Sequence, residues 1–185
     1  MRTGWQAYAI RTFLHGAFLI LLLVFETSFF SVFPLRGVTP DLVLIAAISV
    51  GVLRGYLSGA AFGFAGGMLA DILTGRLIGL GALILAAVGA AAGALGQRIE
   101  SERIPVVLLF NVAGAALYLS LYGAGAWAFG VHMPVWEGVA ALAPWLMAYN
   151  GALSLLLHPF LRRAYRFLDA VYIVPRAPTS GVQGR

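Results

Sequence analysis

Cysteine and lysine are both absent from this chain, and charged residues of any kind are scarce. Of its 185 residues only 10% are charged, whereas 61% are hydrophobic. The lack of cysteine excludes disulfides, thiolate metal sites and a cysteine nucleophile. Every basic residue is arginine, which we attribute to codon usage. A globular domain needs a charged exterior in water, so the scarcity of charge excludes a soluble domain of this size.

Sequence signatures of catalysis are also absent. The chain has no HExxH motif, no GxSxG motif and no glycine-rich phosphate-binding loop. His15, His132 and His158 are far apart in the sequence, and we expect His132 on the opposite side of the membrane from the other two. Ser58 precedes a glycine, as some nucleophiles do, but no histidine or lysine partner is expected near it. The sequence therefore predicts a protein that is not an enzyme and has no cofactor or metal.

Long apolar runs make up most of the chain. A hydrocarbon core about 30 Å thick needs about 20 apolar residues per helix. The runs predict an all-α integral membrane protein, a six-helix transmembrane bundle within residues 1–170, followed by a flexible cytoplasmic tail, 171–185. The first run is too long for the apolar part of a signal peptide, so we expect it to remain as a span. The predicted spans are 12–33, 41–56, 57–73, 77–96, 105–129 and 139–161.

The arginines predict the orientation of the bundle. With six spans, both termini and the links after the second and fourth spans share one side. Only Arg36 and Arg76, two of the twelve basic residues, fall on the other side. Because basic residues concentrate on the cytoplasmic side, both termini are expected in the cytoplasm. The net charge of +5 is then suited to anionic lipid, and we expect no nucleic-acid partner.

Small residues recur along the third and fourth predicted spans. Gly59, Gly63 and Gly67 are four residues apart, as are Gly89 and Gly93. In lipid a glycine-rich helix remains helical, and its small residues let another backbone approach closely. The pattern predicts tight packing of the two spans. The alternative is that part of this glycine face receives a helix from another protein.

Five charged residues are expected in the outer half of the bundle. Asp71 lies near the outer end of its span, where a helix C-terminus disfavours an anion, so it should need a partner. An ion pair with an outer arginine and a contact with another protein are both open. An acid within a span is a functional hypothesis by default. The predicted cluster consists of Glu26, Arg36, Asp41, Asp71 and Arg76.

The remaining polar residues of the spans have structural interpretations. "TPD" predicts a helix start with Thr39 as the N-cap, Pro40 in the first helical position and Asp41 on the positive end of the helix dipole. Asn111 and Asn150 are both expected in the cytoplasmic half, where they could hydrogen-bond to each other.

A set of motifs in the first half of the chain resembles the MreD family of rod shape-determining membrane proteins. A Pro-Asp pair opens an apolar span, an Arg-Gly pair follows at the inner turn, and a glycine-rich span ends in an aspartate. These positions cover about a quarter of the chain. They are Pro40-Asp41, Arg54-Gly55, Gly59, Gly63, Asp71, Gly75 and Gly79 to Leu83.

The resemblance implies a location in the inner membrane of a bacterial cell and a non-enzymatic role in the machinery that inserts peptidoglycan along the side wall. Family members bind MreC and work with RodA, a class B penicillin-binding transpeptidase and MreB. The family is also similar in fold to the S components of energy-coupling-factor transporters, so a vitamin-binding subunit is the alternative function. The loop "HMPVWEG", with His132, Trp136 and Glu137, would be its candidate ligand loop, although such loops are more often interfacial belts.

Overall fold

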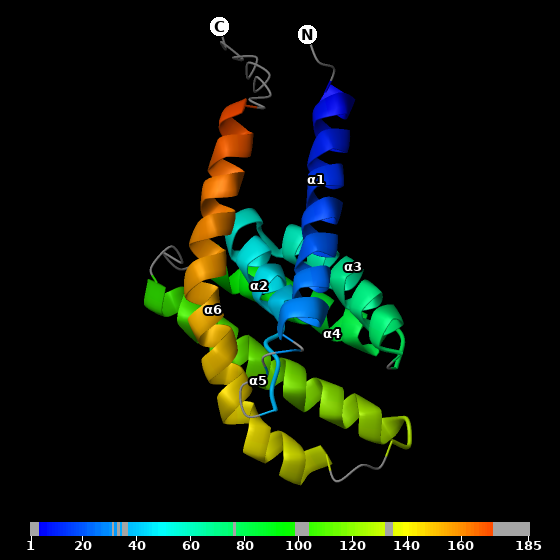
Figure 1. The fold of residues 1–185 in the computed structure, drawn as a ribbon. Helices are drawn as coiled ribbons and strands as arrows, with labels where there is room; N and C mark the ends of the chain where they lie inside the picture. The colour runs from blue at the N-terminus through cyan, green and yellow to red at the C-terminus, as the bar shows by residue number, and fades with distance from the viewer. Residues whose placement is uncertain are drawn as a thin grey trace, which may run out of the picture.

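The computed structural model describes residues 4–30, 32, 34, 37–75, 77–98, 104–131 and 135–171. Within these residues the regular structure is helical, as the sequence predicts (Figure 1). Six α-helices are accompanied by one short π-helix that continues the first of them. They are α1 (Gly4–Phe25), η1 (Glu26–Phe30), α2 (Leu42–Arg54), α3 (Tyr56–Thr74), α4 (Leu80–Gly96), α5 (Ile104–Ala128) and α6 (Val135–Val171).

Helix α2 forms the centre of the molecule. Every residue from Leu42 to Val52 is buried, because the helix is apolar around its whole circumference. It contacts α1, α3, α4, α5 and α6. At a rise of about 1.5 Å per residue, its 13 residues extend about 20 Å, less than the thickness of a hydrocarbon core. A short helix of this kind is sheltered from lipid by the longer helices around it.

Helices α3 and α4 make the closest backbone contact in the fold, as the small residues predict. A Cβ atom added to Gly59 would collide with the carbonyl oxygen of Gly89, and one added to Gly89 would collide with that of Gly59. A Cβ on Gly63 would collide with the carbonyl oxygen of Leu85, and one on Gly67 would lie 2.5 Å from an α4 backbone atom. The glycine face of α3 is therefore filled by the chain's own α4.

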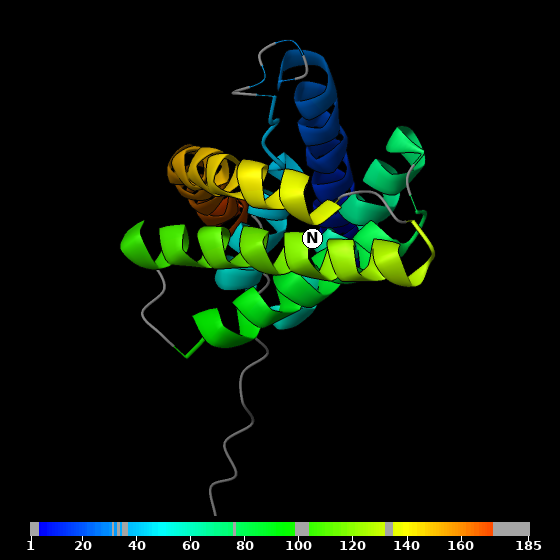
Figure 2. The same ribbon diagram turned by 90° about the horizontal axis from the view of Figure 1, so that it is seen from below.

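Helices α5 and α6 pack against each other, and both contact α2. Figure 2 shows α5 along the lower face of the molecule, with the first turns of α6 beside it. The structure continues α6 over 37 residues, through Pro144 and Pro159, to Val171. The helix is therefore ten residues longer at its C-terminal end than the predicted span 139–161. The arginine-rich segment after that span is part of the same helix.

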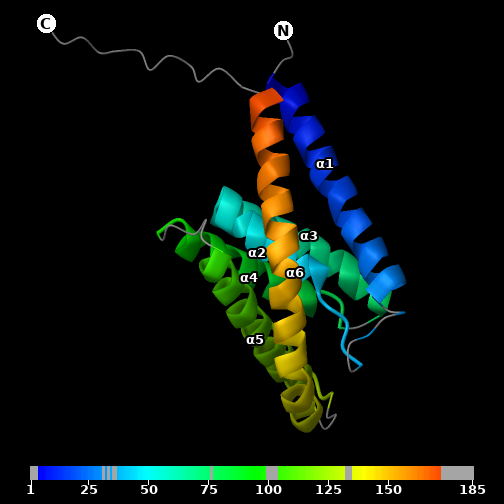
Figure 3. The same ribbon diagram turned by 60° about the vertical axis from the view of Figure 1, so that its left-hand side comes forward.

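Among the described residues, three segments are long and apolar enough to cross a membrane. They are Thr12–Phe30, Tyr56–Thr74 and Pro105–Ala128, while Leu42–Arg54 and Leu80–Gly96 are shorter apolar helices. The count of six membrane spans remains a prediction. The start of α1 and the end of α6 lie at the same end of the molecule (Figure 1, Figure 3). The predicted tail lies outside the described residues, except Val171.

Candidate functional site

The N-terminus of α2 is a junction of three segments. Asp41 is the N-cap, because its backbone is extended (φ −99, ψ 92) and its Oδ1 accepts a hydrogen bond of 2.7 Å from the Leu44 amide. The sequence-based assignment of Thr39 as N-cap and Pro40 as first helical residue is therefore wrong. Leu42 is the first helical residue, so Asp41 occupies the cap position, where its carboxylate accepts from a free amide of the first turn.

Two more side chains bind the same helix start. Glu26, at the start of η1, accepts a 2.9 Å hydrogen bond at Oε2 from the Leu42 amide. Asn150, in the middle of α6, accepts one of 2.9 Å at Oδ1 from the Asp41 amide. Because free amides and the helix dipole both favour an acceptor here, the two carboxylates are stabilised at this place. The junction ties the ends of α1 and α2 to α6.

The predicted pairing of Asn111 with Asn150 is wrong. Asn150 is directed to the start of α2, and the Asn111 amide donates to the Val107 carbonyl of its own helix at 2.9 Å. Both side chains are fully buried. The placement of Asn150 in the cytoplasmic half also changes, since it lies beside the start of α2, which is expected on the outer side.

Asp71 caps a helix other than its own. Its Oδ2 accepts hydrogen bonds from the Gly79 amide at 2.9 Å and from the Ala82 amide at 3.3 Å, and only 4% of the residue is exposed. Gly79 is the N-cap of α4 and has no side chain to cap it. The carboxylate, unfavourable at the C-terminus of α3, is thus stabilised by the positive end of α4. A Cβ on Gly81 would collide with Asp71 Oδ1, so this glycine makes room for the carboxylate.

The five predicted outer charges are not one contact network in the part of the chain that is described. Glu26 and Asp41 share the start of α2, whereas Asp71 binds amides at the start of α4. Arg36 and Arg76 lie outside the described residues. Sequence reasoning missed the role of Asp71 as a cap; the available signal was the glycine at position 79, which starts α4 without a capping side chain.

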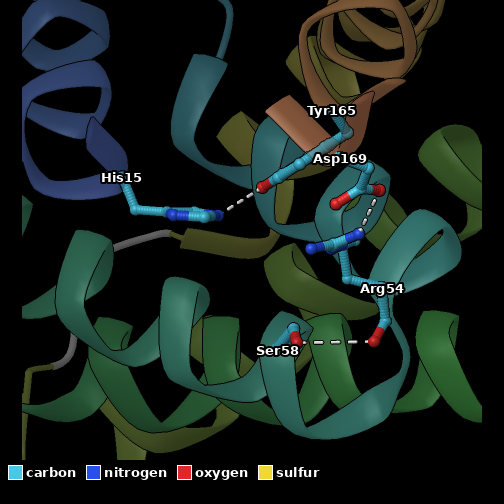
Figure 4. A network of polar contacts seen from close by, with 5 residues as sticks. All are labelled: His15, Arg54, Ser58, Tyr165 and Asp169. Carbon is cyan, nitrogen blue, oxygen red and sulfur yellow. Dashed lines mark hydrogen bonds and ion pairs between the residues drawn. The ribbon is translucent and has the colours of Figure 1, made fainter. Parts of the chain in front are cut away.

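A second polar network lies at the predicted inner turn, where α2 ends (Figure 4). Arg54 Nη1 forms an ion pair of 2.8 Å with Asp169 Oδ2, and its guanidinium carbon lies 5.0 Å from the ring centroid of Tyr165. The Tyr165 hydroxyl in turn lies 2.6 Å from His15 Nε2. The network therefore connects the inner turn with α6 and α1.

Sequence reasoning selected Arg54 and Gly55 but missed their partners. Two features of the sequence could have indicated these partners. Asp169 is the only acid in the arginine-rich segment 162–171, and Tyr165 lies one helical turn before it. Tyr165 lies beyond the predicted span 139–161, and burial raises the pKa of its phenol to about 12, against the lowering effect of Arg54.

Gly55 separates α2 from α3 with a left-handed backbone (φ 94), which favours glycine. A Cβ at this position would also lie 2.5 Å from Nε2 of Gln97, just after α4. The inner turn, the end of α4 and the end of α6 are thus close together. This is the grouping of ends that the predicted topology requires.

The remaining candidate residues give no further site among the described positions. No group of three His, Asp or Glu side chains there could hold a metal ion. His15 and His158 lie on α1 and α6, and His158 is buried. In the candidate ligand loop, His132 lies outside the described residues, as do the side chains of Trp136 and Glu137.

The comparison with known families decides the identity. The model of the rod shape-determining protein MreD matches residues 8–168. The chain belongs to the MreD family. No curated protein and no solved structure matches the chain. The family assigns the chain to rod shape determination and to the membrane, and the apolar helices agree with that placement.

Nearly all residues of the two polar networks lie within the matched segment. Glu26, Asp41, Asp71 and Arg54 are inside it, and Asp169 is one residue beyond its end. The glycine positions of α3 and α4 are inside it as well. The similarity to transporter S components, which the resemblance implied, remains a prediction.

Proposed function

We propose that this chain is a non-enzymatic scaffold of the bacterial elongation machinery that binds MreC and supports side-wall peptidoglycan synthesis. RodA, a class B penicillin-binding transpeptidase and MreB are proposed as members of the same complex. The observation that carries the proposal is the match of the MreD family model to residues 8–168. Asp41, Glu26 and Asp71 each accept hydrogen bonds from helix-start amides of this chain, an arrangement suited to holding helices in place.

The proposed orientation places both termini in the cytoplasm, with the protein in the inner membrane. Ten of the twelve arginines would then be cytoplasmic, in agreement with the bias of membrane proteins. The ion pair between Arg54 and Asp169 supports this arrangement, because it joins two segments that the topology assigns to the same side.

The glycine face is not the surface proposed for MreC, since α4 fills it. The opposite side of α3 and the outward sides of α1 and α5 remain open to lipid or to a partner. Leu57 on α3 is 72% exposed, Phe13 on α1 74% and Leu109 on α5 66%. Association of helices in lipid depends on packing and interhelical hydrogen bonds, so apolar faces of this kind can hold a partner helix.

The test is site-specific photocrosslinking in the native membrane of a rod-shaped host. A photoreactive residue replaces Phe13, Leu57 or Leu109, with the fully buried Leu44 as the matched control. The proposal expects MreC among the adducts of at least one exposed position and none from position 44. Recovery of paired ATPases and a coupling protein in place of MreC would indicate a transporter subunit. Absence of MreC from every exposed position, in variants that restore rod shape, would overturn direct binding.

In the part of the chain that the structure describes, no observation favours the transporter alternative. Two grooves, of about 260 and 330 Å³, lie against the start of α1 and both include His15. In the proposed orientation they are near the cytoplasmic surface, whereas a vitamin pocket would be in the outer half.

A further inference from the structure

A groove lies between the middle of α1 and the C-terminal half of α6. The two helices meet through the His15–Tyr165 contact and through the stacked rings of Phe18 and Phe160, whose centroids are 6.4 Å apart. Beside these contacts lies an open space of about 260 Å³. Its lining includes Leu14, His15 and Phe18 from α1 and Phe160, Ala164 and Phe167 from α6. The lining is therefore almost wholly apolar.

The position of the groove relative to the bilayer follows from the proposed orientation. Its α1 residues lie near the start of the predicted span 12–33, and its α6 residues begin in the last turn of the predicted span 139–161 and continue beyond it. The groove then lies where the acyl chains of the cytoplasmic leaflet meet the headgroups. Phe160 and Phe167 are 57% and 68% exposed, so the groove opens outward from the protein.

Positive charge borders the groove on α6. Arg163 is one turn before Phe167, on the edge of the lining face, whereas Arg166 lies on the opposite side of the helix. Both are exposed, and neither has an ion-pair partner in the described part of the chain. The acid nearest in sequence, Asp169, is paired with Arg54. An anion that reaches this edge therefore meets a net positive charge.

We propose that the groove binds one anionic phospholipid of the cytoplasmic leaflet. Part of an acyl chain lies between α1 and α6, and the phosphate binds at Arg163. Pockets for whole ligands begin at about 300 Å³, so this groove suits a segment of chain and not an entire lipid. Basic sites between helices on the cytoplasmic side select acidic headgroups, and the apolar lining requires a ligand with a hydrocarbon part.

Bound lipid would also have a structural effect on α1. This helix has few contacts with α2 and α3, and its inner half is joined to α6 by a few side chains. An acyl chain between the two helices would add van der Waals contact on both sides. The lipid would thus hold α1 in place.

The test is native mass spectrometry of the full chain, purified in mild detergent with equal amounts of phosphatidylglycerol and phosphatidylcholine. We expect one retained phosphatidylglycerol and little phosphatidylcholine. Arg163→Gln should lower phosphatidylglycerol retention about fivefold. The matched control, Arg98→Gln, changes an exposed arginine after α4 and should retain the lipid.

A second pair of variants tests the groove itself. Ala164→Phe fills the space and should displace the lipid, whereas Ala152→Phe changes an exposed alanine elsewhere on α6 and should not. Each variant is first checked for a monodisperse elution profile. Equal retention of the two lipids by the unsubstituted chain would overturn the proposal. So would unchanged retention in a well-folded Ala164→Phe chain, or competition by soluble glycerol phosphate alone.

A photoreactive residue at position 164 separates lipid from protein occupants in native membranes. A phospholipid adduct supports the proposal, and a protein adduct without lipid overturns it. The inference rests on the proposed orientation but not on the proposed partner. If no MreC crosslinks form but the lipid is retained, only the proposed scaffold function is refuted. If MreC crosslinks form but no lipid is retained, only the proposed lipid site is refuted.

Discussion

Replacement of Asp71 should destabilise the bundle because α4 has no capping group of its own. A single oxygen, Oδ2, accepts hydrogen bonds from the partly buried Gly79 amide and from the Ala82 amide, whose hydrogen bond is buried. In Asp71→Ala both amides lose their partner; the unpaired Ala82 amide costs about 1–3 kcal/mol, whereas the Gly79 amide can bind water and costs less. Loss of the charge at the helix start adds about 0.3–1 kcal/mol. The variant no longer buries a carboxylate, which offsets part of this cost, so we expect the free energy of unfolding to fall by about 2–4 kcal/mol.

The conservative variant separates the hydrogen bonds from the charge. In Asp71→Asn the amide oxygen can occupy the place of Oδ2 and accept both bonds, so only the charge term of about 1 kcal/mol is lost. The sequence-based alternative, an ion pair with Arg76, has the opposite expectation, since both variants remove the charge and should be equally damaging.

The assay is thermal unfolding of the full chain in detergent, followed by size-exclusion of a fluorescent fusion. For a domain of this size 1 kcal/mol corresponds to about 2–4 °C in Tm, so Asp71→Ala should melt about 5–15 °C lower and Asp71→Asn only a few degrees lower. Asp169→Ala, at a half-exposed ion pair, is the control and should change little. Equal losses for the two Asp71 variants, or no loss in either, would refute the capping account.

Three further predictions concern other contacts. Gly63→Leu should prevent folding, because the leucine side chain would collide with the α4 backbone. The control, Gly16→Leu, places its side chain in open space and should yield a monodisperse protein. Normal cell shape and normal complex recovery with Gly63→Leu would contradict this prediction. Asp169→Asn should cost less than about 1 kcal/mol, measured as Tm, because Arg54 and its partner are partly exposed; a larger loss would show the pair to be shielded from water. Glu26→Ala should lower stability by about 1 kcal/mol and Glu26→Gln by much less, because glutamine keeps an oxygen that accepts the hydrogen bond from the Leu42 amide. Equal losses of Tm for the two variants would contradict the role of Glu26 as an acceptor at the start of α2.

Much of the helical framework was predictable because it depends on local features. Runs of apolar residues mark the helices, and a left-handed glycine at position 55 separates two of them, as the Arg-Gly pair indicates. Helix ends were less accurate. Span 77–96 was predicted to start at Leu77, but α4 starts at Leu80 because Gly79 has φ 94 and is the N-cap. The continuation of α6 to Val171 was missed because its charged turns are not apolar.

The sequence by itself determined that this is a membrane protein, since so few charges cannot cover a soluble fold. It also determined that α3 and α4 pack closely, because small residues at a spacing of four form one helix face. Its motifs indicated the family that the full comparison establishes. These conclusions depend on composition and periodicity, which can be read from the sequence without knowing which distant residues are in contact.

Only the tertiary structure decided the partners of the polar residues. Asp41 meets Asn150 across 109 positions of sequence, and His15 meets Tyr165 across 150. A hydrogen bond requires its atoms within about 3 Å, so its partner depends on how far each helix shifts and turns in the packed bundle. Periodicity selects a helix face but not the neighbour opposite to it. For that reason Asp71 could be recognised from the sequence as needing a partner, but not as the cap of α4.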